Sequence, residues 1–220
     1  MSAMTTALRR ARATDASFLA WVMLEASRGH VGRGAWDVYV DGPEPRVLAL
    51  LERLAVQAEP SFCRWEGFLV AEVDGAPAAA LSGYDPGAPG MANPDPAIAS
   101  AVVDAFGWDE PRRHAADTRL DPFITCVSVP PPETWIVEWV ATRPELRRRG
   151  LIRDLLQAVV AEGRRRGFRR SQITLFIGNT SAQLAYERAG YRVVGEKRHP
   201  DFARLMGCPG LARMTCEIAP

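Results

Sequence analysis

The chain has few of the residues that form metal sites and disulfides. Among its 220 residues are four cysteines and three histidines. No two cysteines form a Cys-x-x-Cys pair, and their spacing to the histidines matches no zinc-site pattern. The sequence therefore predicts reduced thiols and no metal, and a chain of this length can bury a core without either.

Long apolar runs and an excess of one charge are missing as well. No apolar stretch approaches the roughly 18 residues of a membrane span, and the first residues lack the apolar region of a signal peptide. With 27 basic and 26 acidic side chains, the net charge of +1 argues against a nucleic-acid-binding protein that works by overall positive charge. We expect a cytoplasmic protein that binds neither membranes nor nucleic acid.

The charge is nevertheless unevenly distributed along the chain. Residues 143–170 carry ten basic and three acidic side chains, a local net charge of +7, and the remainder carries 17 and 23, a net charge of −6. All the basic residues except Lys197 are arginines, a bias typical of a GC-rich bacterial genome. Because arginine also suits phosphate better than lysine does, we expect an anionic ligand along this segment.

Apolar periodicity and turn signals predict a mixed α/β fold in one domain, residues 1–220, with an insertion at about 85–133. The clearest signal is Asp74-Gly75, the dipeptide of a type I′ turn, between two strand-like runs. The expected elements are strands at 7–12, 67–73, 76–82, 123–129, 135–141, 172–177, 191–197 and 211–218, helices after Asp15 and Pro45 and at 97–106, 151–166 and 181–188, and loops at 27–42 and 84–96.

A run of arginines precedes the helix expected from residue 151. Cations are poorly placed at a helix N-terminus, whose free N–H groups carry partial positive charge. Arg147, Arg148 and Arg149 stand immediately before this start, and Gly150 allows close approach to the backbone. An anion such as pyrophosphate would complete the arrangement; the alternative is a solvated basic turn.

Two motifs in this region resemble a known family. Residues 147–152, Arg-Arg-Arg-Gly-Leu-Ile, are similar to the acyl-CoA loop Arg/Gln-x-x-Gly-x-Gly/Ala of the GCN5-related N-acetyltransferase (GNAT) superfamily, with Ile152 in the position usually held by Gly or Ala. Residues 179–191 resemble its second signature, Asn-x-x-Ala-x-x-x-Tyr-x-x-x-Gly-Phe/Tyr. The two lie in the family's order, and the match is dense over about residues 135–196.

The resemblance implies a largely antiparallel, splayed sheet with helices on both faces, and transfer of an acetyl group from acetyl-CoA to a primary amine of a small molecule or peptide. Asn179 would contact the pantetheine arm or cap the following helix. The residues that would hold CoA are Val140, Ala141, Thr142, Arg147, Arg148, Arg149, Gly150, Leu151, Ile152 and Asn179.

Glu138 and Tyr186 are the candidate catalytic residues. The resemblance assigns Tyr186 as the acid for the departing thiolate, which is reasonable because a phenol titrates near pH 10 and a thiol near 8.5; the alternative is a core aromatic. Glu138 is the one charge within an apolar strand, where a carboxylate is costly unless it is paired or functional. It is a candidate base for the amine, whose deprotonation at pH 7 costs about 4.6 kcal/mol, or the partner of a buried arginine.

The acceptor site is expected in residues 25–39, with the insertion as a second candidate region, and His30, Trp36 and Tyr39 combine a titratable group with aromatic walls; an ordinary surface loop is the alternative. Two other classes stay open for the whole chain. One is a CoA-binding sensor or partner-binding module without transferase activity, and the other is a nucleic-acid binder that uses the arginines of 143–170. A homodimer is compatible with the sequence.

Overall fold

Seven strands form one sheet in the order β1-β2-β3-β4-β5-β7-β6. The computed structural model describes residues 4–91 and 96–218, so part of the expected loop at 84–96 lies outside it. Among the described strands β4 and β5 are parallel and every other neighbouring pair is antiparallel. The strands are β1 (Thr6–Arg10), β2 (Phe68–Val73), β3 (Ala76–Tyr84), β4 (Thr134–Thr142), β5 (Arg170–Phe176), β6 (Arg192–Arg198) and β7 (Gly210–Glu217).

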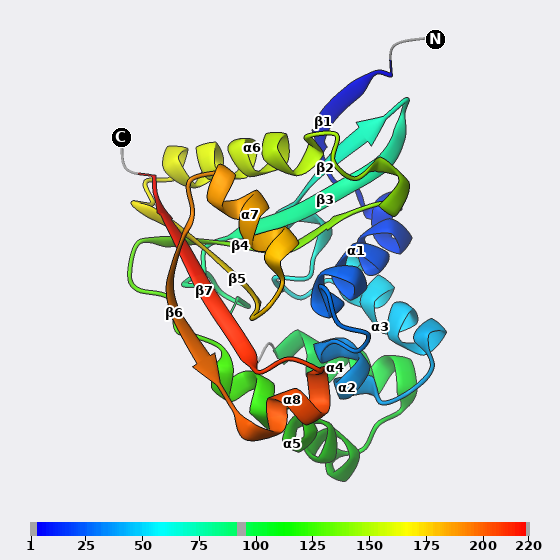
Figure 1. The fold of residues 1–220 in the computed structure, drawn as a ribbon. Helices are drawn as coiled ribbons and strands as arrows, with labels where there is room; N and C mark the ends of the chain where they lie inside the picture. The colour runs from blue at the N-terminus through cyan, green and yellow to red at the C-terminus, as the bar shows by residue number, and fades with distance from the viewer. Residues whose placement is uncertain (1–3, 92–95, 219–220) are drawn as a thin grey trace.

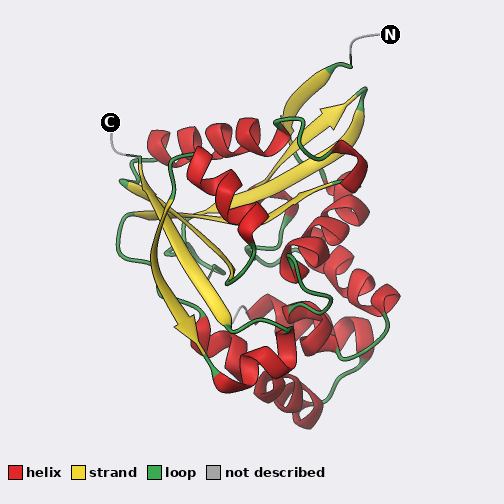
Figure 2. Ribbon diagram, viewed as in Figure 1, coloured by secondary structure: helices red, strands yellow, loops and turns green. Residues whose placement is uncertain are grey.

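Helices cover both faces of the sheet, as Figures 1 and 2 show. Helix α6 packs on β2, β3, β4 and β5 from one side, whereas α1 packs on β3 and β4 from the other and holds α3 against itself. The predicted splayed, largely antiparallel fold with helices on both faces is therefore confirmed. The helices are α1 (Ala16–Arg28), α2 (Ala35–Val40), α3 (Glu44–Val56), α4 (Pro96–Phe106), α5 (Glu110–Cys126), α6 (Leu151–Arg165), α7 (Thr180–Arg188) and α8 (Pro200–Met206).

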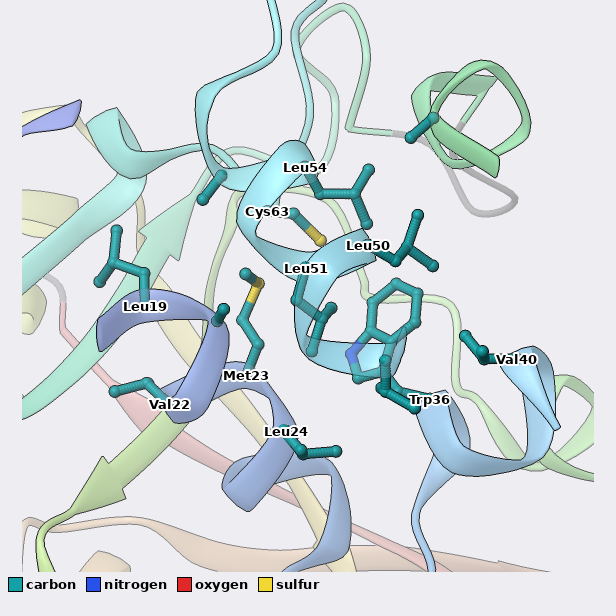
Figure 3. Packing of buried hydrophobic residues seen from close by; sticks show 14 of the residues in the cluster. Leu19, Val22, Met23, Leu24, Trp36, Val40, Leu50, Leu51, Leu54 and Cys63 are labelled. Carbon is teal, nitrogen blue, oxygen red and sulfur yellow. The ribbon is translucent and has the colours of Figure 1, made fainter. Parts of the chain in front are cut away.

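Each face of the sheet has its own apolar core. The α1-side core is built from the inward stripes of α1, α2 and α3, and Figure 3 shows Met23, Trp36 and Leu51 meeting there. The α6-side core contains Leu155 and Val159 of α6 together with the strand residues that point the opposite way. Because side chains alternate along a strand, these two clusters tell which face each strand residue occupies.

Trp135 sets the distance between α6 and the sheet. Its indole lies where a Cβ on Gly163 of α6 would come within 2.6 Å of the ring, and a Cβ on Gly83 of β3 would come within 2.7 Å of its nitrogen. The guanidinium of Arg166 stands over the same ring at 5.1 Å. Two glycines therefore make room for one fully buried tryptophan.

The helix α5 replaces the strand that was predicted at residues 123–129, and that prediction is wrong. The helix runs through Pro122 to Cys126, and its apolar residues do not recur on one face, so the sequence carried no helical period. Tertiary contacts fix its middle and its C-terminal end. Arg119 donates hydrogen bonds to the carbonyl oxygens of Val38 and Tyr39, at 3.3 and 2.9 Å.

Lys197 of β6 holds the end of α5. Its Nζ donates to the carbonyl oxygens of Thr125 and Val127, at 3.4 and 2.9 Å. These carbonyls belong to the last turn and the cap, where a helix has no backbone donors left for its own oxygens. A cation is also favoured there by the helix dipole. The strand β6 and the helix α5 are thereby joined.

Two short helices were also missed. Residues 27–42, predicted as a loop, contain α2, whose first turn is capped because Asp37 accepts a hydrogen bond from the Gly34 N–H at 2.9 Å and pairs with Arg28 at 2.7 Å. The helix α8 begins where the His199 ring accepts a hydrogen bond from the Asp201 N–H at 3.1 Å. None of the helices within the described residues is long and apolar enough to cross a membrane.

Candidate active site

The strands β4 and β5 separate halfway along their length. They pair from Thr134 with Arg170 to Val137 with Ile173, and beyond this point β5 stays paired with β7 up to Phe176. The second half of β4 is therefore an open edge inside the sheet, on the side that faces β5.

A β-bulge coincides with this separation. Ser82 of β3 pairs with Glu138 and Ala80 pairs with Ala141, so β4 has one residue more than β3 in this interval. Trp139 has a φ of 54°, a conformation that is strained for an aromatic residue. The bulge places Glu138 and Trp139 on the same face, because Val137 and Val140 both belong to the α6-side core.

Glu138 lies on the α1 side of the sheet at the bulge. Burial raises the pKa of its carboxyl group to about 7, and a hydrogen bond from Tyr84 of β3 acts in the opposite direction. Within the described residues Glu138 has no ion pair with an arginine, the structural role that the sequence left open. A carboxyl group that titrates near neutrality is suited to accept a proton at physiological pH.

Tyr84 was not predicted from the sequence as a site residue. It pairs with Ile136 across the β3–β4 ladder, and Glu138 lies two positions along on the same face. Only the register of β3 with β4 could have identified Tyr84 as a neighbour of Glu138. No local motif does so, because the two residues are more than 50 positions apart in the chain.

The basic loop, residues 147–152, has the backbone of an anion-binding site. Arg148 and Gly150 have φ values of 62° and 84°, and they flank Arg149. Alternation between left- and right-handed residues turns successive N–H groups toward one concavity. In the described part of the chain no hydrogen bond uses the N–H groups of residues 148–153.

The side chains of the basic loop leave the same concavity accessible. Arg148 and Arg149 are exposed, while Leu151 and Ile152 contribute to the α6-side core. Ile152, the departure from the family pattern, thus places its bulk in the core. The residues present fit a pyrophosphate group, since free N–H donors, a helix N-terminus and exposed cations meet at one place.

Asn179 caps α7. Its side-chain oxygen accepts a hydrogen bond from the Ala182 N–H at 3.2 Å, which is one of the two roles that the sequence allowed. The nitrogen of the same amide lies near Gly29: a Cβ added to Gly29 would come within 3.0 Å of it. His30 is exposed beside Gly178. The loop after α1 therefore borders the start of α7.

Tyr186 of α7 lies in the α6-side core with 6% of its surface exposed. Burial raises the pKa of its hydroxyl well above the usual value, so it stays protonated at physiological pH. Its ring lies 6.4 Å from that of Tyr191, whose hydroxyl is bonded to the Ser171 hydroxyl at 2.7 Å. Glu138 thus lies on the α1 side of the sheet and Tyr186 on the α6 side. The open edge of β4 is accessible from either side where β4 and β5 separate.

Trp36 and Tyr39 are buried and do not line an open loop. They belong to a chain of neighbouring rings with centroid distances between 5.7 and 6.3 Å. Burial raises the pKa of Tyr39 to about 12. The aromatic chain, in order of contact, consists of Tyr84, Phe62, Trp139, Trp36, Tyr39, Trp108 and Phe106.

The structure therefore assembles one part of the predicted site and disperses another. The open edge of β4, the basic loop, Asn179 and Tyr186 follow one another along the chain and surround the separation of β4 and β5. His30 lies at the border of this region. Trp36 is buried against the Trp139 ring, and Tyr39 is buried against Trp36. No three His, Cys, Asp or Glu side chains in residues 4–91 and 96–218 gather as metal ligands.

An open strand edge beside a loop with free N–H donors can accommodate an extended ligand that carries a phosphate group. The sequence profile of the Acetyltransferase (GNAT) family matches residues 41–191. The chain belongs to this family, whose general activity is N-acetyl transfer from acetyl-CoA. No curated protein sequence matches the chain.

Solved structures share the fold across nearly the whole chain. An N-acetyltransferase from Staphylococcus aureus Mu50 is 18% identical with a TM-score of 0.63, over 95% of this chain and 99% of that chain. A GCN5-related N-acetyltransferase from Kribbella flavida is 18% identical with a TM-score of 0.57, over 96% and 97%. At these identities the similarity establishes the fold alone.

Proposed function

We propose that this protein transfers an acetyl group from acetyl-CoA to a primary amine by direct attack of the amine, with Glu138 as the base and Tyr186 as the acid. The observation that carries the proposal is a carboxyl group of raised pKa, about 7, at the bulge where β4 leaves β5. When bound, acetyl-CoA supplies the thioester that is cleaved.

Each residue has a defined part in this proposal. N–H groups of residues 148–152 bind the pyrophosphate, and the open edge of Val140, Ala141 and Thr142 orients the pantetheine arm as an added strand would be oriented. Glu138 takes a proton from the ammonium group, so that the nitrogen can form its bond to the carbonyl carbon. As the carbon–sulfur bond breaks, Tyr186 gives its proton to the sulfur, and the second proton of the attacking nitrogen passes through solvent to the Tyr186 phenolate.

The decisive experiment is release of free CoA thiol from acetyl-CoA over a panel of amines, with product mass as the second readout. Thiol release that depends on an amine, with a mass gain of one acetyl group on that amine, supports the proposal. Binding of acetyl-CoA with no turnover across the panel would instead favour the binding-module alternative.

Replacing arginines of the basic loop should weaken acetyl-CoA binding selectively. The double variant Arg148→Gln/Arg149→Gln should raise the KM for acetyl-CoA by about ten-fold, the equivalent of about 1.4 kcal/mol, with little change in the KM for the amine. The matched control is Arg164→Gln/Arg165→Gln, which removes the same charge from the other end of α6. Equal effects in both variants would show that overall charge, and not the loop, attracts the cofactor.

Replacing Tyr186 by phenylalanine should slow the reaction and leave the fold intact. Its hydroxyl makes no hydrogen bond within the described residues, so the melting temperature should be unchanged, whereas kcat should fall by about 10²-fold, the low end for general acid catalysis. The matched control is Tyr191→Phe, which loses the bond to Ser171. That variant should lose about 1 kcal/mol of stability and keep its kcat. Full single-turnover rates in Tyr186→Phe would exclude the acid role.

A further inference from the structure

Arg143 stands between the two parts of the proposed cofactor site. The open edge of β4 ends at Thr142, and the basic loop begins at Arg147. Arg143 and one turn of 3-10 helix, Pro144–Leu146, join them. Two parts that would bind different ends of one molecule are thus connected by a very short segment.

The backbone and the side chain of Arg143 are both fixed to β3. The Arg143 N–H donates a hydrogen bond to the Ala78 carbonyl oxygen at 2.8 Å, and its Nε donates to the Pro77 carbonyl oxygen at 2.9 Å. Because the donors of a planar guanidinium have fixed directions, the second bond also sets the orientation of the side chain.

The guanidinium of Arg143 lies over two rings of α1. Its central carbon is 5.3 Å from the centroid of Phe18 and 5.4 Å from that of Trp21, and these rings stack on each other at 5.7 Å. A cation over the face of an aromatic ring is attracted to it. Arg143 is half-buried, so β3 and α1 hold it from two directions.

The segment after Arg143 is held at both of its ends. The Arg143 carbonyl oxygen accepts a hydrogen bond from the Leu146 N–H at 2.9 Å, and Leu146 packs against the α6-side core. The side chain of Arg147 donates back to the Thr142 carbonyl oxygen at 3.4 Å. The position of Arg143 therefore determines where the basic loop starts relative to the open edge.

We infer that Arg143 is a positioning residue for acetyl-CoA, which holds the open edge of β4 and the basic loop at the spacing at which both ends of one cofactor molecule bind together. The inference rests on the function proposed above and adds a residue whose side chain is engaged by β3 and α1. Two linked groups bind more tightly than either alone where the geometry lets both engage at once. Loss of this spacing should therefore weaken binding of the whole cofactor and leave binding of its separate parts unchanged.

The first test compares acetyl-CoA with two fragments of it by calorimetry. ADP carries the pyrophosphate, and S-acetylpantetheine carries the arm without the pyrophosphate. The variant Arg143→Met keeps an unbranched side chain and loses the guanidinium. It should raise the Kd of acetyl-CoA about ten-fold and change the Kd of each fragment by less than about two-fold.

Three results would contradict the inference, and they are distinguishable. An unchanged Kd for acetyl-CoA in Arg143→Met would show that the spacing does not depend on this residue. An equal loss of affinity for ADP would show that Arg143 acts by its charge and not by position. Absence of binding of acetyl-CoA and of both fragments to the wild-type protein would overturn the cofactor assignment itself, and this inference with it.

Kinetics provide a second readout. Arg143→Met should raise the KM for acetyl-CoA about ten-fold, with kcat and the KM for the amine within about two-fold of wild type. Arg143→Lys should show a smaller rise, because its ammonium group can still lie over the two rings. A fall in kcat with an unchanged KM for acetyl-CoA would overturn the positioning role.

The matched control is Arg46→Met. The guanidinium of Arg46 in α3 lies over the ring of Phe106 in α4 at 4.4 Å, so both variants remove one charge and one contact between a cation and an aromatic ring. Both should lower the melting temperature, and Arg143→Met alone should weaken binding of acetyl-CoA. An equal loss of affinity in Arg46→Met would show that lowered stability is sufficient to weaken binding, and it would overturn the role of Arg143.

Discussion

Glu138→Gln should lower kcat by about 10²–10⁴-fold at pH 8, the contribution expected of a positioned general base. Glutamine has nearly the same shape and keeps a hydrogen-bond partner for Tyr84, but it cannot accept a proton at physiological pH. The KM for acetyl-CoA should stay within a factor of about two, because the basic loop is untouched. Steady-state kinetics with a saturating amine measure both values.

The pH dependence should identify the same group. Only the ionised carboxylate is a base, so with a pKa of about 7 the wild-type rate should fall as the pH drops through 7. The Gln variant should lack this acidic limb. Because the hydrogen bond from Tyr84 lowers the pKa of Glu138, Tyr84→Phe should move the limb to higher pH. A pH–rate profile that Glu138→Gln leaves unchanged would remove the base from the mechanism.

Stability should change in the opposite sense to activity. The carboxyl group titrates near 4.5 when exposed and near 7 in the folded protein. Between these values the unfolded chain is ionised and the folded one is not, so stability falls as the pH rises and the penalty is complete above pH 7. Glu138→Gln should therefore have a higher melting temperature than wild type at pH 8. Glu110→Gln, which replaces an exposed glutamate, should change neither activity nor stability appreciably.

Gly163→Ala should lower the melting temperature by roughly 5–10 °C, equivalent to a loss of about 2–3 kcal/mol from overpacking. The added Cβ would lie 2.6 Å from the Trp135 ring, which is fully buried and confined on the other side by Gly83. Neither the tryptophan nor α6 has space to move away. Thermal unfolding followed by circular dichroism measures the loss.

The control for this substitution is Gly195→Ala in β6, where an added Cβ meets nothing within 4 Å. It should change the melting temperature by a degree or two at most. In an isolated helix alanine is more favourable than glycine by about 1 kcal/mol. An unchanged or raised melting temperature in Gly163→Ala would mean that the higher helix propensity of alanine outweighs the steric conflict with Trp135. In that case Trp135 does not fix the position of α6.

Much of the basic loop could be predicted because its information is local. A helix start, the arginines before it and Gly150 are adjacent in the chain, so their spacing alone indicates an anion-binding loop. The hairpin at Asp74-Gly75 was predicted for the same reason: both residues have positive φ values, 51° and 79°, as the turn requires.

The surroundings of Glu138 could not be predicted in the same way. Tyr84 reaches Glu138 only through the register of β3 with β4, and Trp139 has its positive φ at a bulge, a conformation that no sequence rule assigns to a tryptophan. The helix α2 is stabilised by Arg28 and Arg119, which come from two other helices. Arg28 belongs to the preceding helix, and Arg119 lies 80 residues from Tyr39 along the chain. Contacts with other helices therefore override the local propensity of residues 35–40.

Lys197, the one lysine of the chain, has its ammonium group bound to two carbonyl oxygens at the end of α5. The chain thus has a single side-chain amine, and this amine caps α5. Acetylation of lysine removes its positive charge. A reagent that acetylates lysine side chains would therefore act on this chain at one side chain, and it would remove the cation from the end of α5.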